Sequence, residues 1–377
     1  MASQRSIMFV INGLAVGGAE RQLLDLIPPI AERGHTVSLV TINDDMRLAH
    51  ALPSQIRHYA IGAKQWSDFA YVLSTFWRVV RRERPDVIHG HLFQANVLSR
   101  IGKLANAGVR VINTTHCSYS SAGRSYNPYL VYRWTNRWVD WHTSVSRPAL
   151  EELRAWGSIS PAKSSLLSNA IDVQKFECAN PGRGLHEESG DREFRWIAVG
   201  RLSLVKNYGL LLQAVNALKG KGHRFRLDIA GEGVQLALLR HLINEYDLGQ
   251  SVRFLGLIHD LPARLSEYDG YVISSDNEAL PMALLEAMAA GLPVVGTQVG
   301  EVGSLLEGSG GGYLVAPRDV AAFAAAMARM MSLDTVTLGK MGARNRVYVD
   351  STFGMERIVN AWDKIYQAQH LAASGAA

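Results

Sequence analysis

The sequence is poor in cysteine and lacks the patterns of a membrane-spanning segment and of a leader. It holds two cysteines, Cys117 and Cys178, in 377 residues. Two cysteines cannot build a disulfide framework, so a reducing compartment is expected. No apolar run approaches the length of about 18 residues that a spanning helix needs. The opening stretch MASQRSIMFVIN has one Arg and a short apolar run, unlike a signal peptide. We therefore expect a cytoplasmic protein.

Signatures of common ligand sites are missing as well. The first glycine stretch, NGLAVGGAE at 12–20, matches neither G-x-G-x-x-G nor G-x-x-x-x-G-K-[ST]. This excludes a nicotinamide or flavin fingerprint and a P-loop at that position. No D-x-D occurs in the chain, although enzymes that hold a nucleotide sugar through a divalent metal usually need such a carboxylate pair. We expect neither a cofactor nor a required metal ion.

Charge is distributed unevenly along the chain. Residues 1–171 carry a net charge of +8 and the remainder −3, within a total of +5. The basic half could face nucleic acid, an anionic membrane or a phosphorylated substrate, or it could be ordinary solvated charge. The Lys and Arg residues are not grouped with a recognition motif, which argues against nucleic acid as a partner.

Short strand-like runs alternate with longer runs of helical spacing throughout the chain, and 47% of the residues are hydrophobic. This alternation predicts βαβ units and parallel sheets, and therefore an α/β fold. A polar stretch at 175–193 interrupts it and is interpreted as a linker or surface loop. The predicted strands are 7–12, 36–42, 86–91, 110–116 and 141–146 before this stretch, and 195–201, 226–233, 252–258, 270–275, 293–298 and 312–317 after it.

The two halves predict two doubly wound, Rossmann-like domains of similar size that face a central cleft. We place the first domain at 1–171 and the second at 172–352. Residues 353–377 are expected to form a C-terminal helix that packs back on the first domain. Open parallel sheets bind ligands beyond the carboxyl ends of their strands, so the loops after the strands are the candidate ligand sites.

Two of these loops suit an anionic ligand. Gly17 and Gly18 allow a close approach to the backbone just before a predicted helix, whose free N–H groups attract anions; a plain tight turn would need the same residues. Arg201 and Lys206 follow the first strand of the second domain in VGRLSLVKN. Two cations at that edge could hold a diphosphate, or they could be surface charge on a loop.

Two glutamates lie eight residues apart in DNEALPMALLEAMAAGLPVV, residues 276–295. Pro281 and Gly291 suit the start and end of a short, mostly apolar helix. Glu278 precedes that helix and could cap it. Glu286 lies within it, where an ionised group is costly unless it finds partners; sugar hydroxyls would serve, or the residue could lie on a solvated stripe.

Together these motifs resemble a known family in order and spacing over nearly the whole chain. The chain resembles the GT-B glycosyltransferases, in particular the large retaining family 4. The motifs that carry the resemblance are GGAE (17–20), SNAID (168–172), VGRLSLVKN (199–207), AGEG (230–233), FLG (254–256) and the E-x7-E pair followed by EAMAAGLPVV.

The resemblance implies a role for each candidate residue. Glu286 would bind the ribose hydroxyls, and Arg201 and Lys206 would hold the diphosphate, which Gly17 or Gly18 would approach. The catalytic residues that it implies are His116, Glu278, Arg201 and Lys206. The donor-binding residues that it implies are Gly17, Gly18, Arg201, Lys206, Ile258 through its backbone, Glu278, the amides of Ala279 and Leu280, and Glu286.

Some positions leave alternatives open or depart from the family pattern. His116 follows a predicted strand and matches a family histidine near the reacting sugar, although a structural histidine at a strand end is the alternative. His89 and His91 are also at a strand end, and one or both are expected to be structural. Ala279 stands where the family usually has Gly, and Ser304 where relatives often have Glu.

The resemblance implies a metal-independent hexosyltransferase that acts with retention. The donor would be a nucleotide sugar, by family frequency a UDP-hexose or UDP-N-acetylhexosamine. The acceptor would be a glycan or a lipid-linked oligosaccharide in the synthesis of a cell-surface polysaccharide such as lipopolysaccharide. A nucleotide-sugar epimerase of the same fold and a non-catalytic nucleotide-sugar-binding subunit are the alternatives.

Two basic stretches bear on where such an acceptor would be met. RWTNRWVDWH (133–142) mixes Arg with Trp, and RVVRRER (78–84) is strongly basic. Both could contact the anionic inner face of a membrane, which would make the protein peripheral there. Ordinary helix surface with its aromatic residues turned to the core is the alternative.

Overall fold

The computed structural model describes residues 4–63, 68–116, 127–176, 193–258 and 260–368. The chain divides into two compact units. The first, here the N-terminal unit, is Met1–Ala170 together with Met355–Ala377, and the second, here the C-terminal unit, is Ile171–Gly354. The domain boundaries expected from the sequence were 171/172 and 352/353, and the structure has them at 170/171 and 354/355. Each unit is described by itself below.

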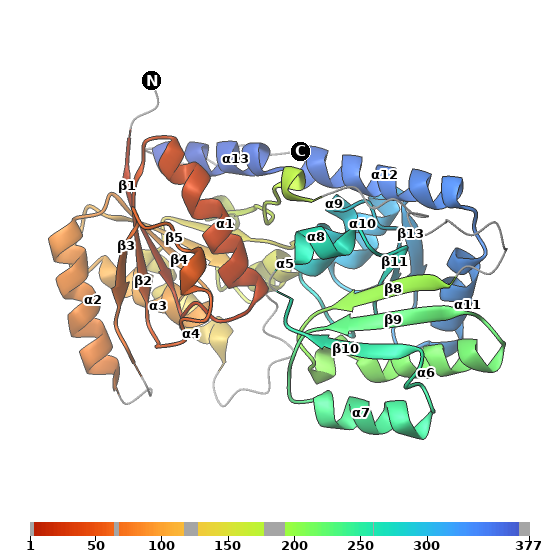
Figure 1. Cartoon of the computed structure of the whole chain (residues 1–377). Helices are drawn as coiled ribbons and strands as arrows, with labels where there is room; N and C mark the ends of the chain where they lie inside the picture. Colours follow the sequence, from red (N-terminus) through yellow and green to blue (C-terminus); the bar gives the residue numbers. More distant parts are fainter. Residues whose placement is uncertain (1–3, 64–67, 117–126, 177–192, 259, 369–377) are drawn as a thin grey trace. The chain divides into compact units, whose positions relative to one another are not determined.

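The N-terminal unit contains a parallel sheet in the order β3-β2-β1-β4-β5-β6-β7 (Figure 1). Each strand pairs in parallel with its neighbours, so all carboxyl ends lie at one edge. The strands are β1 (Ser6–Ile11), β2 (Thr36–Thr41), β3 (Arg57–Ala60), β4 (Val87–His91), β5 (Arg110–Thr115), β6 (Trp141–Ser144) and β7 (Ser164–Leu166). The helices are α1 (Gly18–Glu32), α2 (Phe69–Glu83), α3 (Phe93–Gly102), α4 (Pro128–Thr135), α5 (Arg147–Ala155) and α13 (Met355–Gln367).

Both faces of this sheet are covered, because strands such as β1 and β4 are apolar or buried at nearly every position. One apolar cluster combines β1 with α1 and α13, and another combines it with α2 and α3. Helix α13 contributes Trp362 and Tyr366 to the first cluster. Ion pairing of Asp363 with Arg33 at 2.7 Å, and hydrogen bonds from Arg110 to two carbonyl groups near its end, hold α13 in place.

The C-terminal unit has a second parallel sheet, in the order β10-β9-β8-β11-β12-β13. Its strands are β8 (Phe194–Val199), β9 (Phe225–Ala230), β10 (Val252–Gly256), β11 (Gly270–Ile273), β12 (Val294–Thr297) and β13 (Gly312–Val315). Its helices are α6 (Tyr208–Gly220), α7 (Leu236–Glu245), α8 (Leu261–Leu265), α9 (Met282–Ala289), α10 (Glu301–Ser309), α11 (Val320–Met331) and α12 (Thr335–Phe353).

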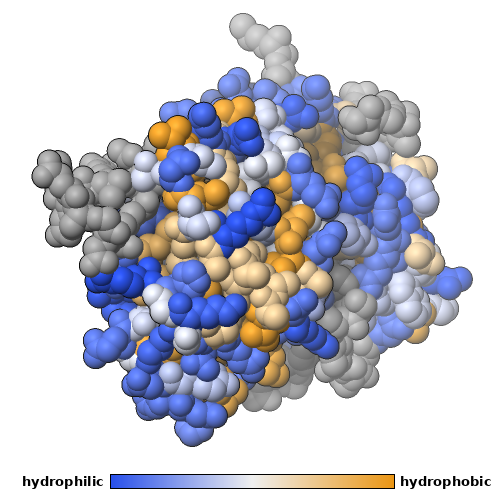
Figure 2. Space-filling view, turned by 90° about the vertical axis from the view of Figure 1, so that its right-hand side faces the viewer, coloured by the Kyte–Doolittle hydropathy of each residue, from blue (hydrophilic) through white to orange (hydrophobic). Residues whose placement is uncertain are grey.

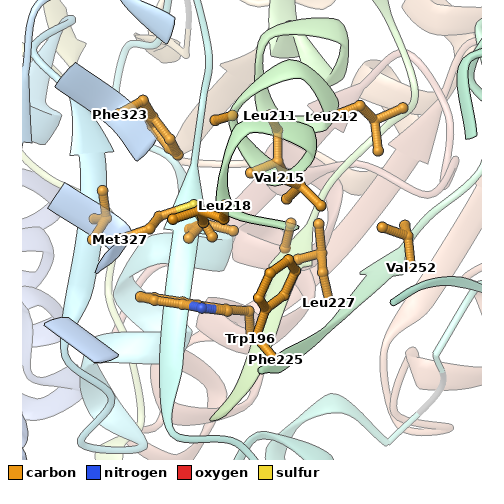
Figure 3. Packing of buried hydrophobic residues seen from close by; sticks show 14 of the residues in the cluster. Trp196, Leu211, Leu212, Val215, Leu218, Phe225, Leu227, Val252, Phe323 and Met327 are labelled. Carbon is orange, nitrogen blue, oxygen red and sulfur yellow. The ribbon is translucent and has the colours of Figure 1, made fainter. Parts of the chain in front are cut away.

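One apolar cluster of this unit joins β8, β9 and β10 to α6, α7 and α11. Figure 3 shows Trp196 and Phe225 of the sheet below Leu211, Val215 and Leu218 of α6. Helix α11 adds Phe323 and Met327 from the side. This packing fixes α6 on the sheet. The loop that joins β8 to α6 carries Arg201 and Lys206.

The surface of the C-terminal unit near α11 is mixed. Figure 2 shows the side of the molecule that lies to the right in Figure 1, where hydrophobic residues gather near the middle and hydrophilic residues surround them. Exposed positions of α11 include Ala321, Ala325 and Arg329, so the apolar surface that this helix exposes comes from short side chains. In the described ranges, no helix combines the length and the apolar character that crossing a membrane requires.

The predicted α/β class and the eleven predicted strands are confirmed, with shifts of one to three residues at their ends. Strands β3 and β7 were not predicted, because RHYA and SSL lack an apolar run that would mark a strand. The interpretation of 175–193 as a linker falls largely on 177–192, outside the described residues.

Candidate active site

Three sequence motifs meet at the carboxyl ends of β8, β9 and β10. Gly200 N–H donates to Ala230 O at 2.9 Å, and Gly231 N–H donates to Gly256 O at 2.7 Å. The backbone at Gly231 has φ +141°, and a Cβ there would lie 2.0 Å from Gly200 O. Glycine at 231 is therefore required for the loops after β8 and β9 to approach each other, which places VGR, AGEG and FLG side by side.

Lys206 and Glu278 form an ion pair at this edge. Lys206 Nζ lies 2.5 Å from Glu278 Oε1, with the two side chains 24% and 10% exposed. Ser275 Oγ donates to the same Glu278 oxygen at 2.6 Å. Glu278 does not cap α9, which begins after Pro281 with no side-chain cap. The capping alternative is thus excluded, and one of the two predicted carboxylates is brought to one of the two predicted cations.

The loop that carries Glu278 is held by the loop after β12. Gly300 has φ +49°, and a Cβ there would lie 1.7 Å from Glu278 O. Glu301 N–H, at the start of α10, donates to Ala279 O at 3.0 Å. Thr297 Oγ1 donates to Ser275 O at 2.6 Å. These contacts with the loop after β12 fix the backbone of Glu278 and Ala279.

Two adjacent amides of this loop have no acceptor among the described residues: the N–H groups of Ala279 and Leu280. Leu280 is buried, at 7% exposure. Ala279 is not among the residues with positive φ, so the backbone here does not need glycine. The departure from the family pattern at 279 therefore causes no backbone strain.

Glu286 lies on α9 and is half-buried. Burial raises the pKa of Tyr271 well above its usual value, and the charges of Glu278 and Glu286 both contribute to the increase. Tyr271 OH and Tyr208 OH donate to the carbonyl groups of Val199 and Gly200, at 3.3 and 3.1 Å. Two buried tyrosines thus support the turn that precedes Arg201, with both glutamates nearby.

Arg201 is exposed, and its guanidinium makes no hydrogen bond or ion pair within the described residues. It begins the loop in which Lys206 lies, and a Cβ at Gly200 would come within 3.5 Å of Lys206 Cε. Ile258 follows β10 and is half-buried, and its backbone N–H and C=O likewise have no partner in the described ranges. These groups can accept a ligand without losing an existing contact.

A network that the sequence did not predict borders this edge. Asp276 accepts from Asn207 Nδ2 at 2.9 Å and pairs with Arg318 Nη2 at 3.1 Å. Asn207 has φ +45°, and its side chain caps α6 by accepting from Leu210 N–H at 3.2 Å. The network ties the β8, β11 and β13 loops together. No local motif marks it, because its members are far apart in the sequence.

In the N-terminal unit, α1 begins at Gly18, and Gly17 is its N-cap with extended backbone. A Cβ at Gly17 would lie 2.3 Å from Glu20 Oε2. The carboxylate of Glu20 therefore already lies against the helix start that the sequence assigned to an anionic ligand. The role proposed for Gly17 and Gly18 stays a prediction.

His116 lies directly after β5 and is hydrogen-bonded to His91 of β4, with 3.0 Å between His116 Nε2 and His91 Nδ1. His89 bonds to Tyr366 and Thr114, each at 2.8 Å, as expected of a structural histidine. Burial lowers the pKa of His116 to about 4. Burial also lowers the pKa of His89 and of His91 well below 6.5. All three rings are neutral near pH 7.

In the part of the chain that the structure describes, no three His, Cys, Asp or Glu side chains are grouped so as to bind a metal ion. The candidate residues are distributed over both units. Arg201, Lys206, Ile258 and the residues from Glu278 to Glu286 belong to the C-terminal unit, and Gly17, Gly18 and His116 belong to the N-terminal unit.

Comparison with solved structures supports the GT-B fold. The chain superposes on Alr3699/HepE from Anabaena, solved in complex with UDP-glucose, with a TM-score of 0.82. The match covers 96% of this chain and 99% of that protein at 19% sequence identity. At this identity the likeness establishes the fold, which agrees with the prediction.

Curated relatives include glycosyltransferases of surface polysaccharides. The chain is 34% identical over 180 residues to the putative colanic acid biosynthesis glycosyltransferase WcaL of Escherichia coli K12, covering 46% of this chain. This match spans 44% of WcaL, less than half of its length. The chain is 24% identical to an Escherichia coli UDP-Gal:alpha-D-GlcNAc-diphosphoundecaprenol alpha-1,3-galactosyltransferase, over 73% of this chain and 74% of that enzyme.

Family models match both halves of the chain. The model of Glycosyltransferase Family 4 matches residues 16–175, and the model of Glycosyl transferases group 1 matches residues 186–346. The two matches together leave only the ends and a short internal stretch uncovered. With the ordered motifs and the two parallel sheets, they show that the chain belongs to the group 1 glycosyltransferases of family 4.

Proposed function

We propose that the protein transfers a sugar, with retention of configuration, from a UDP-hexose or UDP-N-acetylhexosamine to a glycan or lipid-linked acceptor. The observation that carries the proposal is the grouping of Lys206, Glu278 and the free amides of Ala279 and Leu280 at one sheet edge. This edge is where open parallel sheets bind their ligands. Binding of UDP-glucose by the structural relative HepE supports a uridine donor.

The charges at this edge suit a diphosphate leaving group. Negative charge accumulates on the departing phosphate in the transition state, and preorganised donors stabilise it. Arg201 can turn its unpaired guanidinium onto two phosphate oxygens, because its planar fork matches them. Lys206 is already held by Glu278, which fixes the position of its ammonium group. In this proposal the two cations do the work of a divalent metal, so none is required.

The carboxylates and amides of this edge suit the rest of the donor. Glu278 and the amides of Ala279 and Leu280 present one acceptor and two donors to the hydroxyl groups of the transferred sugar. Glu286, about one helical turn into α9, would accept from the ribose hydroxyls. The free backbone groups of Ile258 would pair with the base. The backbone groups assigned here, the amides of Ala279 and Leu280 and the N–H and C=O of Ile258, have no partner among the described residues, whereas Glu278 contacts Lys206 and Ser275.

The acceptor side is proposed to work at the inner face of a membrane. Helix α4 exposes Leu130 and Trp134, at 47% and 79%, with Arg133 exposed between them. Apolar and basic side chains together favour an anionic lipid surface. Trp141, by contrast, lies in the core, so only part of the basic aromatic stretch can take this role. The lipid-linked acceptor in the name of the galactosyltransferase relative supports the same placement.

Donor binding is tested by titrating the protein with UDP, GDP and ADP in a calorimeter. We expect UDP to bind most tightly, and Arg201→Ala to weaken it. The control Arg195→Ala removes a half-buried arginine near the other end of β8. If no nucleotide binds, or if both variants bind UDP as the wild type does, the assignment of this edge is wrong.

Transfer is tested by nucleotide release from UDP-glucose, UDP-galactose and UDP-N-acetylglucosamine, with vesicles that contain N-acetylglucosaminyl-diphosphoundecaprenol. Release that depends on the acceptor distinguishes a transferase from a binding subunit, and conversion of the donor without acceptor would indicate an epimerase. Sedimentation with anionic vesicles tests the membrane contact: Trp134→Ala should reduce it, whereas the control Trp156→Ala, 51% exposed in the wild type, should not.

A further inference from the structure

The two ring nitrogen atoms of His116 differ in their hydrogen bonding. Nε2 is hydrogen-bonded to His91 Nδ1 at 3.0 Å. No partner occupies Nδ1 in the described part of the chain, and His116 is half-buried, whereas His91 is 1% exposed. Register explains the contact: β4 and β5 are neighbours, His91 pairs with Thr114, and His116 is two residues further on the same side of the sheet.

The turn after His91 is held firmly. Leu92 has φ +71° and ψ +166°, a backbone conformation that glycine favours. Asn96 N–H donates to Leu92 O at 2.9 Å, and Asn12 Oδ1 accepts from Ala95 N–H at 3.2 Å. The ring of His91 lies 4.2 Å from that of His89, centroid to centroid. The imidazole of His91 thus has little freedom to turn away from His116.

The environment of His91 selects one tautomer of the pair. Both rings are neutral near pH 7, because burial lowers both pKa values, so each carries one N–H. His91 Nε2 is buried and has no hydrogen-bond partner among the residues that the structure describes. A buried N–H without an acceptor is rarer in folded proteins than a buried acceptor without a donor. The proton of His91 therefore belongs on Nδ1, from which it is donated to His116 Nε2.

We propose that His91 is a positioning residue that keeps the proton of His116 on Nδ1, so that His116 donates a hydrogen bond to a substrate oxygen. His116 is then a donor to a sugar or acceptor oxygen and not the base that removes the acceptor proton. The inference rests on the proposed function for its consequence, but not for the tautomer itself. It deepens that function by assigning a role to His91 and by defining what His116 can recognise.

The tautomer is measured directly by long-range ¹H–¹⁵N correlation spectra of the imidazole groups in the intact, ligand-free protein at pH 7. Loss of one signal set in His116→Gln identifies His116 among the 12 histidines. The expected result is a protonated Nδ1 and an unprotonated Nε2. The opposite pattern, with the proton on Nε2, would overturn the proposal. This measurement needs no substrate, so it stands even if the proposed function fails.

Two variants test the consequence. His91→Leu removes the donor, and we expect turnover to fall by about 100-fold because the reacting geometry is lost. UDP binding should stay unchanged, and the His116 signals should show mixed tautomers. His91→Asn places an amide N–H near the former Nδ1 and should restore both the tautomer and most of the turnover. Equal loss in the two variants would contradict the hydrogen-bond role.

A matched control is His142→Asn, which alters a buried histidine that bonds to Thr115 and Arg100 and not to His116. It should leave the His116 tautomer as in the wild type. If His91→Leu does not fold, the wild-type spectrum still determines the tautomer. The effect on turnover is then determined by comparing the turnover of His91→Asn with that of His142→Asn. Transfer activity combined with an Nε2–H tautomer would refute this inference alone.

Discussion

Gly300→Ala perturbs the site at a residue that is not itself a proposed ligand contact. Gly300 lies directly before α10 with φ +49° and ψ −130°, a region that is essentially restricted to glycine. A Cβ there would lie 1.7 Å from Glu278 O and 3.2 Å from Ala279 O. Both atoms belong to the backbone, so the clash cannot be relieved by a side-chain rotation. The Glu278–Ala279 segment must move by more than 1 Å, since Cβ contacts below about 3.0 Å essentially do not occur.

The cost has two parts. Backbone strain contributes about 1–3 kcal/mol. Loss of the hydrogen bond from Glu301 N–H to Ala279 O contributes about 0.5–1.5 kcal/mol more. We expect a total of about 2–4 kcal/mol, which lowers the melting temperature of a domain of this size by about 5–15 °C. Because Glu278 moves with its backbone, UDP-sugar affinity should fall as well.

Differential scanning calorimetry measures the first effect and isothermal titration with UDP-glucose the second. The control is Gly310→Ala at the other end of α10, where φ is +63° and no atom of the described residues lies within 4 Å of an added Cβ. That variant carries backbone strain alone, about 1–2 kcal/mol. If Gly300→Ala melts within 1 °C of Gly310→Ala and binds UDP-glucose equally well, then the role assigned to the Gly300 contact is wrong.

Other predictions concern charge and pH. Arg201→Ala should lower turnover by about 10²–10³-fold in the nucleotide-release assay, because the charge on the departing phosphate loses a donor; wild-type turnover would refute the assignment. Lys206→Met should lower the unfolding temperature, since it leaves Glu278, whose side chain is 10% exposed, without its cation; an unchanged temperature in calorimetry would show that the pair is not stabilising. Burial lowers the pKa of His116 from 6.5 to about 4, so the unfolded state binds the proton more readily. The free energy of unfolding therefore has its full value above pH 6.5 and falls by about 3 kcal/mol as the pH is lowered to 4. Urea unfolding of His116→Leu should show a smaller decrease over the same pH range. Nucleotide release should persist in excess EDTA; its loss, restored by Mg²⁺ or Mn²⁺, would show that a metal is required.

Much of the fold and the edges at which ligand groups gather could be predicted from the sequence. Apolar runs separated by amphipathic runs locate the strands of a parallel sheet, and residues that follow strands fall at one edge. That rule brought Arg201 and Lys206 into consideration, and the family resemblance added His116. Strand order could not be predicted in the same way, so the sequence did not reveal that β4 adjoins β5 and that His91 therefore contacts His116.

Contacts between distant loops are the part that the sequence could not supply. Glu278 was interpreted as a possible helix cap, because the next helix in the chain begins only four residues later, at Met282. Its partner Lys206 is 72 residues away. The requirement for glycine at 300 likewise depends on Glu278 O, which only the folded structure brings near. A carboxylate's neighbours in space, not in sequence, decide its role here.

The last described helix completes the first unit. Helix α13 places Trp362 and Tyr366 in the apolar cluster of β1 and α1, and Tyr366 OH also bonds to His89. During synthesis, therefore, the first sheet emerges from the ribosome long before the segment that covers one of its faces. The face of the first sheet that α13 covers stays partly exposed until all of Ile171–Gly354 has been translated. A premature stop codon after Gly354 would leave the C-terminal unit complete. The N-terminal unit would lack α13 and so one part of its apolar cluster.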